Sequence, residues 1–77
     1  MRKQTFQLVF ESDPEGGYTV TVPALPGCIT YGKDMEEARE MVREAIELCL
    51  EDMAANGEEV PEVDATLVGS IQVEVAA

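Results

Sequence analysis

A single long amphipathic pattern constrains this chain more than any other feature, and it predicts a helix over residues 35–56. Apolar side chains recur there at the i, i+3, i+4, i+7 spacing that places them on one side of a helix. Asp34 is the predicted N-cap, Glu37 completes a capping box, and Gly57 can adopt the left-handed conformation that ends a helix. The predicted apolar stripe contains Met35, Ala38, Val42, Ala45, Ile46, Cys49 and Met53, with Met41, Leu48 and Leu50 at its edges.

The other side of the same helix is acidic. One interpretation is a solvated surface on which Arg39 and Arg43 form i, i+4 ion pairs with neighbouring glutamates. The other is a docking stripe of a single sign for a basic protein partner, and both interpretations stay open at this point. The glutamates of this acidic stripe fall within roughly 80° of arc, and they are Glu36, Glu40, Glu44, Glu47 and Glu51.

Two stretches before the helix predict a β-hairpin. Residues 5–11 and 18–22 each alternate apolar and polar side chains, which is typical of half-buried strands. The intervening residues 12–17 contain Pro14 and two glycines, which is the composition of a tight turn.

A corner and two further strands complete the predicted elements. Pro23 and Pro26 cannot donate ladder hydrogen bonds, so residues 23–27 are predicted to form a rigid corner. Residues 28–32 are predicted as a short third strand that leads into the helix cap. Residues 71–75 alternate again after the helix and predict a fourth strand.

The predicted order of elements is β-β-β-α-β, an α+β fold in a single domain over residues 1–77. The first three strands form an antiparallel meander. A right-handed crossover through the helix brings the last strand beside the first and parallel to it, in the sheet order 3-2-1-4. One sheet face then packs on the helix residues Val42, Ala45, Ile46, Cys49 and Met53 through Phe6, Leu8, Phe10, Val20, Val22, Ile71 and Val73.

A net charge of −11, from 16 acidic and 5 basic residues, restricts the partners of the chain. Phosphate backbones are bound through Lys and Arg, so neither nucleic acid nor an anionic membrane is an expected partner. The acidity either only keeps the protein soluble or attracts a basic protein. No signal peptide pattern or membrane-spanning apolar run is visible, so we expect a cytoplasmic protein with Cys28 and Cys49 as free thiols.

A set of residues from Phe10 onward points to a known family. The set is Gly16-Gly17-Tyr18, Val22-Pro23, Leu25-Pro26-Gly27-Cys28, Thr30, Gly32, Glu36-Glu37-Ala38 and Glu44-Ala45-Ile46. In this order the residues resemble the HicB-like antitoxin domain, over roughly residues 5–61. The most specific part of the resemblance is the succession of proline corner, glycine-bounded strand and capped helix.

The resemblance implies a truncated ribonuclease H-like fold of three strands, a helix and a further strand. It also implies a partner, because HicB-like domains typically neutralise HicA toxins, which are small basic ribonucleases with a double-stranded-RNA-binding-like fold. HicB proteins often carry a second, C-terminal DNA-binding domain, for which this sequence leaves no room after its fourth strand. We therefore expect a domain that binds and occludes a HicA-type toxin; the alternative is a stand-alone acidic homo-oligomeric module with a regulatory or scaffolding role.

An enzyme is not expected, although the implied fold resembles a nuclease. Ribonuclease H chemistry needs several clustered carboxylates to hold two metal ions, and the predicted strands offer Glu11 and Glu74, both near strand ends. The chain has no His, and no Ser stands beside a base that would activate it. No catalytic residue, metal site or cofactor is predicted.

Two surfaces are predicted to make protein contacts. Tyr31 either fills a position of the third strand or anchors a contact beside the proline corner, because Tyr gives contact area at low entropic cost. The predicted partner-binding residues are Tyr31, Pro23, Leu25, Pro26, Glu36, Glu40, Glu44, Glu47 and Glu51.

A homo-oligomer, most simply a two-fold dimer, is the second predicted assembly. A chain of 77 residues has a thin core that gains from burial against another copy. Residues 71–75 also lack the Pro and Lys that usually guard a free strand edge. The predicted oligomer interface comprises Leu48, Leu50, Ile71, Val73 and Val75.

Overall fold

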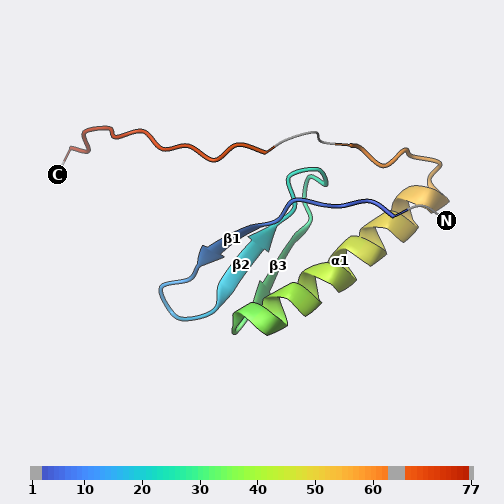
Figure 1. Ribbon diagram of the computed structural model, residues 1–77, viewed down its shortest axis with the longest axis horizontal. Helices are drawn as coiled ribbons and strands as arrows, with labels where there is room; N and C mark the ends of the chain where they lie inside the picture. Colours follow the sequence, from blue (N-terminus) through green and yellow to red (C-terminus); the bar gives the residue numbers. More distant parts are fainter. Residues whose placement is uncertain (1–2, 63–65, 77) are drawn as a thin grey trace.

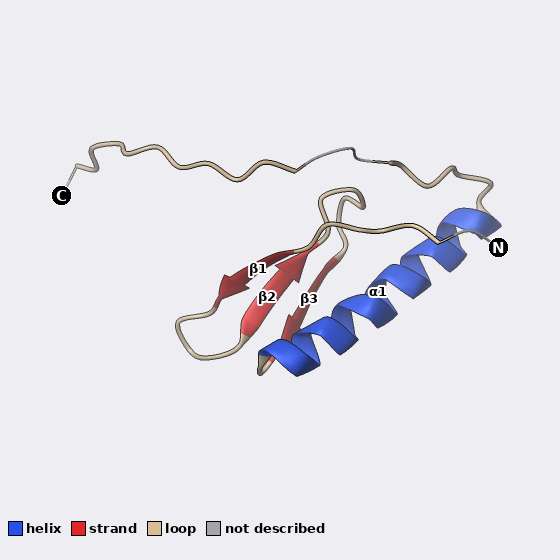
Figure 2. Cartoon of the chain, viewed as in Figure 1, coloured by secondary structure: helices blue, strands red, loops and turns tan. Residues whose placement is uncertain are grey.

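Three short strands followed by one long helix make up the regular structure, in a computed structural model that describes residues 3–62 and 66–76. Strands β1 (Val9–Ser12), β2 (Tyr18–Thr21) and β3 (Ile29–Gly32) pair antiparallel in that spatial order, and helix α1 (Met35–Ala55) follows them. Figure 1 shows α1 running diagonally along the sheet, and Figure 2 separates the helix from the strands by colour. The predicted α+β class, the hairpin, the meander and the helix are confirmed.

Local hydrogen bonds hold the turn between β1 and β2. The Asp13 N–H donates to the Gly17 carbonyl at 2.9 Å, and the Gly16 N–H donates to the Asp13 carbonyl at 2.9 Å. The Asp13 Oδ1 accepts the Glu15 N–H at 2.8 Å, as in an Asx turn. Gly16 and Gly17 have φ values of 105° and 81°, which residues with a Cβ rarely adopt, so the two glycines allow the chain to reverse here.

The corner after β2 is a closed loop. The Val22 N–H donates to the Cys28 carbonyl at 3.2 Å, and the Cys28 N–H donates to the Leu25 carbonyl at 3.0 Å. This closure turns the Leu25 side chain inward, where it is 2% exposed, while Pro23 and Pro26 stay at the surface. The corner therefore buries Leu25 and the smaller Ala24 and presents two prolines to solvent.

Both ends of α1 carry the predicted caps. The Asp34 Oδ1 accepts the Glu37 N–H at 2.8 Å, which satisfies one of the unpaired donors of the first turn. At the other end, Gly57 has a φ of 69° and the Glu58 N–H donates to the Met53 carbonyl at 2.9 Å, as in a Schellman motif. The helix begins at the predicted residue and ends one residue earlier than predicted.

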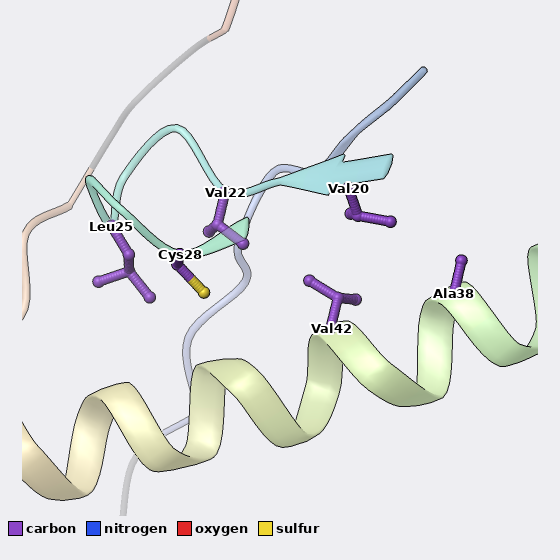
Figure 3. Packing of buried hydrophobic residues seen from close by; sticks show 6 residues of the cluster. All are labelled: Val20, Val22, Leu25, Cys28, Ala38 and Val42. Atoms are coloured by element: carbon purple, nitrogen blue, oxygen red, sulfur yellow. The ribbon is translucent and has the colours of Figure 1, made fainter. Parts of the chain in front are cut away.

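The core lies between α1 and the layer formed by β2, β3 and the corner. Figure 3 shows Ala38 and Val42 of α1 pointing toward side chains of this layer. A Cβ on Gly32 would overlap the backbone of Ala38, so β3 and α1 approach more closely than any other residue would permit. The buried cluster is Val20, Val22, Leu25, Cys28, Ala38 and Val42, with Phe6, Leu8, Phe10, Tyr18, Ala45, Ile46, Cys49 and Met53 packed around it.

One face of the sheet is covered by α1 and the other is open. Val20 lies opposite Phe10 on one neighbouring strand and opposite Thr30 on the other, so these three side chains share the covered face. Because side chains alternate along a strand, Ile29 and Tyr31 point to the open face. Ile29 is 62% exposed and Tyr31 is 49% exposed.

The first strand is shorter than predicted. Strand β1 spans Val9–Ser12, whereas the alternation predicts a strand over residues 5–11. The partner strand β2 ends at Thr21, before the proline corner, so residues 5–8 have no neighbour in the sheet. Phe6 and Leu8 nevertheless pack on the core cluster, and the segment keeps its apolar side inward.

The fourth strand is not present in this structure. No strand occurs within residues 66–76, and Figure 1 shows this segment running in the same direction as β1 and reaching past the hairpin. Ile71 and Val73, which sequence reasoning assigns to the core, are 88% and 69% exposed. A strand forms only where another strand offers hydrogen-bonding partners, and this segment lies beside none.

Candidate protein-interaction surfaces

The acidic stripe lies along the outer side of α1. All of its glutamates are exposed, on the side of the helix that faces away from Ala38 and Val42. Near the start of the helix, Lys33 Nζ is 3.8 Å from Glu37 Oε2, an ion pair one turn apart and largely in solvent. Apart from Arg39 and Arg43, the exposed surface of α1 therefore presents negative charge over most of its length, which attracts cationic surfaces at low salt.

Tyr31 lies on the open face of the sheet. Its hydroxyl donates to the Gly16 carbonyl at 2.8 Å, so the ring is fixed across the end of the hairpin. The ring also lies against Gly17, at a position where a Cβ would overlap it. An aromatic ring that is held in place and half exposed loses little entropy when a partner covers it, which favours the interpretation of Tyr31 as an anchor.

Ile29 extends this surface, and sequence reasoning did not single it out. Ile29 lies opposite Thr21, and Thr21 lies opposite Val9, so the three form one row across the open face. The sequence could have predicted this exposure, because side chains alternate along the third strand. If Cys28 points inward, its neighbour Ile29 points outward. Ile29 and Tyr31 together form the open-face pair, two large exposed apolar side chains on one strand.

Leu25 does not belong to any surface. Sequence reasoning placed it in the partner-binding set with Pro23 and Pro26, and the structure corrects this because its side chain fills the core. The two prolines are exposed, as a surface role requires. Pro-bounded corners look external in sequence, but the hydrogen-bonded closure of this loop forces its central side chain inward.

The two predicted parts of the partner site lie on opposite faces of the molecule. The acidic stripe is on the outer side of the helix layer, whereas Tyr31 is on the outer side of the sheet layer. A flat contact cannot reach both, because the core lies between them. Any single partner that contacts both parts would have to wrap around an edge of the domain.

The predicted oligomer residues are also dispersed. Leu48 is 66% exposed, and Leu50, two positions later, lies about 160° away around the helix. Leu50 lines a groove on the side of α1 that faces the N-terminal segment. Ile71, Val73 and Val75 belong to residues 66–76, the extended C-terminal tail. The structure therefore does not bring these five residues together on one surface.

The groove beside α1 combines apolar walls with a polar and charged rim. Phe6 and Leu8 form one wall, and Val42, Ile46 and Leu50 form the other. Its rim comprises Gln4, Glu36, Arg39, Glu40, Arg43 and Glu47.

The two cysteines are free thiols that lie near each other in the core layer. Cys28 is buried and Cys49 is half-buried. Burial raises the pKa of the Cys28 thiol, and interaction with Cys49 raises it further. A thiol with a raised pKa is a poor nucleophile at neutral pH, so Cys28 acts as a small apolar side chain.

Among residues 3–62 and 66–76, no three His, Cys, Asp or Glu side chains are grouped so that they could hold a metal ion. Glu11 lies on β1 and Glu74 lies in the tail, both exposed. In the same part of the chain, no helix has the length and hydropathy needed to cross a bilayer.

These features define a small α+β domain whose distinctive surfaces are an acidic helix face, an open sheet face and an apolar groove. The chain matches the family model described as the HicB-like antitoxin of bacterial toxin–antitoxin systems over residues 6–74. The protein therefore belongs to the HicB-like antitoxin family, and the resemblance inferred from the sequence is confirmed.

Several curated relatives carry the name UPF0150 protein. The one from Archaeoglobus fulgidus is 54% identical over 46 residues, which cover 60% of this chain and 67% of the relative. One from Synechocystis sp. is 42% identical over 53 residues, or 69% of this chain and 77% of the relative. The one from Thermotoga maritima is 34% identical over 73 residues, or 94% of this chain and 93% of the relative. This last similarity and the family match both include the tail, so the tail is part of the family domain.

Proposed function

We propose that this protein is an antitoxin that binds a small basic HicA-type ribonuclease and occludes its active surface. Membership of the HicB-like antitoxin family carries the proposal. The net charge of −11 supports it, because a strongly acidic domain and a basic enzyme attract each other at long range. The domain acts by binding and performs no catalysis, and it works in the cytoplasm without nucleic acid or membrane as a partner.

The acidic stripe is the proposed docking site for the toxin. Its five glutamates offer one continuous surface of a single sign on the rigid scaffold of α1. Charges at a contact mainly accelerate encounter, whereas buried aromatic and aliphatic side chains hold the complex. If the toxin wraps around the domain edge, Tyr31 and the exposed prolines of the corner supply that second kind of contact.

The finer fold implied by the family is part of this proposal. A truncated ribonuclease H-like arrangement needs a fourth strand, parallel to the first and supplied by residues 71–75. The space beside residues 5–8, which no strand of the described residues occupies, is where such a strand would complete the sheet.

The direct test starts from the reading frames beside this gene: where one of them encodes a short basic protein, that protein is expressed alone and together with the antitoxin. We expect that protein alone to arrest bacterial growth, and coexpression of the antitoxin to restore growth and to yield a copurifying complex. Full growth arrest in the presence of abundant antitoxin, with no complex formed, would overturn the proposal.

Matched charge variants then identify the docking face. Reversal of Glu40, Glu44 and Glu47 to Lys is expected to slow association at low salt by 10-fold or more, since steering raises on-rates by about 10–10³. The control reverses three exposed carboxylates off the stripe, at Glu15, Glu58 and Glu59, and changes the net charge equally. If both triple variants associate at the same rate, the stripe is only a solvated surface.

The alternative function is a stand-alone acidic homo-oligomer with a regulatory or scaffolding role. The exposed apolar side chains of the tail and of the open-face pair favour some form of assembly. The two functions differ in one observation: a neighbouring reading frame for a short basic protein with a double-stranded-RNA-binding-like pattern and a catalytic His supports the antitoxin.

A further inference from the structure

The groove beside α1 has the shape and lining of a site for one β-strand. Its sheet-side wall is the segment 4–8, which is extended, belongs to no strand and turns Phe6 and Leu8 inward. Its helix-side wall contributes Ile46 and Leu50, both only half-buried. An added strand would pair with the backbone of residues 4–8 and place alternate side chains against the helix.

The tail has the pattern that such a site requires. Ile71, Val73 and Val75 alternate with Gln72 and Glu74, so one side of an extended tail is apolar and the other is polar. The three apolar side chains are 88%, 69% and 87% exposed, which is unusual for residues of this type in a folded domain. Glu74 is the one charged residue between positions 66 and 76, in a chain of net charge −11.

The position of the tail separates it from its own groove. The Gln4 Nε2 donates to the Pro61 carbonyl at 2.9 Å, which fixes the start of the tail at the end of the groove. Residues 66–76 run in the same direction as β1 and reach past the hairpin (Figure 1). Residue 71 lies ten positions after Pro61, an extended reach of about 33 Å, whereas residues 4–8 span about 13 Å. The apolar part of the tail therefore lies beyond its own groove.

We propose that residues 71–75 of one copy occupy the groove of a second copy, and that the second copy returns its own tail in the same way. Each tail adds a strand beside residues 4–8, with Ile71, Val73 and Val75 on α1 and with Gln72 and Glu74 on the open face. The exchange is reciprocal, so one two-fold dimer buries both tails and leaves no free groove.

Charge distinguishes this assembly from toxin binding. Two copies of net charge −11 repel each other, and added salt screens that repulsion, so the dimer strengthens as salt increases. An acidic antitoxin and a basic toxin attract each other, so their association slows under the same change. The proposed dimer forms between two copies of this chain without a toxin, so it does not depend on the proposed function.

The experiment measures the mass of the full chain without any toxin. Light scattering at tens of micromolar is expected to give twice the 8.4 kDa of one chain for the native protein and one chain mass for Val73→Asp. The control, Gln72→Asp, adds the same charge on the polar side of the tail and is expected to remain a dimer. Circular dichroism confirms that both variants keep the helix.

Mixing two defective chains tests the exchange itself. Val73→Asp keeps an intact groove and Leu50→Asp keeps an intact tail, so each alone is expected to be monomeric. Their mixture restores one of the two exchanges and is expected to yield heterodimers that neither chain forms alone.

Three results would overturn the proposal. They are a monomeric native protein at that concentration, a dimer that survives Val73→Asp, and a mixture that gives no heterodimer. A monomer whose amides at residues 71–75 are protected from hydrogen exchange would show that the tail occupies its own groove instead.

Discussion

Strand β2 and the tail share an alternation of apolar and polar residues, but the valines are buried at β2 and exposed in the tail. Val20 lies on β2 and Val22 directly follows it. Both alternate with polar residues, as Val73 and Val75 do in the tail. The first pair is 0% and 2% exposed, whereas the second is 69% and 87% exposed. The difference lies in the neighbours: β2 has a strand on each side and a helix above it, and the tail has none of these. Alternation gives a segment one apolar side, but that side is buried only where another element of the structure packs against it.

The largest contrast is expected from matched leucine truncations. Leu25→Ala removes a side chain that is 2% exposed and leaves a cavity among the other five residues of the buried cluster, so we expect a loss of about 2–5 kcal/mol in the free energy of unfolding. Leu67→Ala alters a tail residue that is 93% exposed and is expected to change that free energy by less than about 0.5 kcal/mol. Urea unfolding followed by circular dichroism measures both. Equal losses would show that the tail is packed as firmly as the corner.

Glycine substitutions sharpen the same comparison at the backbone. Gly32→Ala forces a methyl group into the backbone of Ala38, so β3 and α1 must separate, at an expected cost of about 1–3 kcal/mol. Gly69→Ala places the same methyl group in open space in the tail and is expected to be nearly neutral. Thermal melts at matched protein concentration distinguish them. A neutral Gly32→Ala variant would mean that the helix rests on the sheet less closely than this structure shows.

A smaller effect is expected at the helix cap. Asp34→Ala removes the carboxylate that accepts the Glu37 N–H at 2.8 Å, and we expect a loss of about 1 kcal/mol. Asp34→Asn keeps an acceptor oxygen at the same place and is expected to retain most of the stability. Denaturant melts of the two variants measure the difference. If the two variants are equally destabilised, the hydrogen bond is not what Asp34 contributes.

The smallest effect concerns the thiols. Between pH 7 and about 8.5, we expect a thiol-reactive dye to label half-buried Cys49 faster than Cys28, because burial raises the pKa of the Cys28 thiol. Unfolding is expected to make the two rates equal. Cys28→Ala and Cys49→Ala each leave one thiol and assign the two rates. Faster labelling of Cys28 in the folded protein would place it outside the core.

The raised pKa of Cys28 also has a consequence for stability. The folded protein holds the thiol proton more tightly than the unfolded chain does, so the contribution is fully present below the unfolded pKa of about 8.5. It is lost as pH rises from there through the folded pKa. We expect a small decrease in stability above pH 8.5 that Cys28→Ala reduces, as measured by urea unfolding at several pH values.

Local signals in the sequence predicted the helix and the hairpin well. The helix start, its Asp34 cap and its Gly57 terminator were all predicted, because a cap depends on residues within one turn of each other. The helix face toward the sheet was also predicted through Val42, Ala45, Ile46, Cys49 and Met53. The family followed from residues whose order is set by these same local elements.

The surfaces were harder to predict because they depend on how layers stack. Leu25 was placed at the surface and is buried, since the closure of its loop is decided by three hydrogen bonds among residues 22–28. Ile29 went unnoticed, although the register of β3 exposes it beside Tyr31. The acidic stripe was predicted as one continuous surface. Its separation from Tyr31 was not predicted, because it depends on the core that lies between the helix and the sheet.

The sequence by itself determined the elements whose causes are local: the capped helix, the glycine turn, the proline corner and the order of three strands. Only the tertiary structure decided which apolar side chains are buried, because burial depends on a neighbouring surface that no short window of sequence contains. The tail shows this most clearly. Residues 71–75 have the pattern of a buried strand, yet they are exposed here because the surface that would cover them is not beside them within this chain.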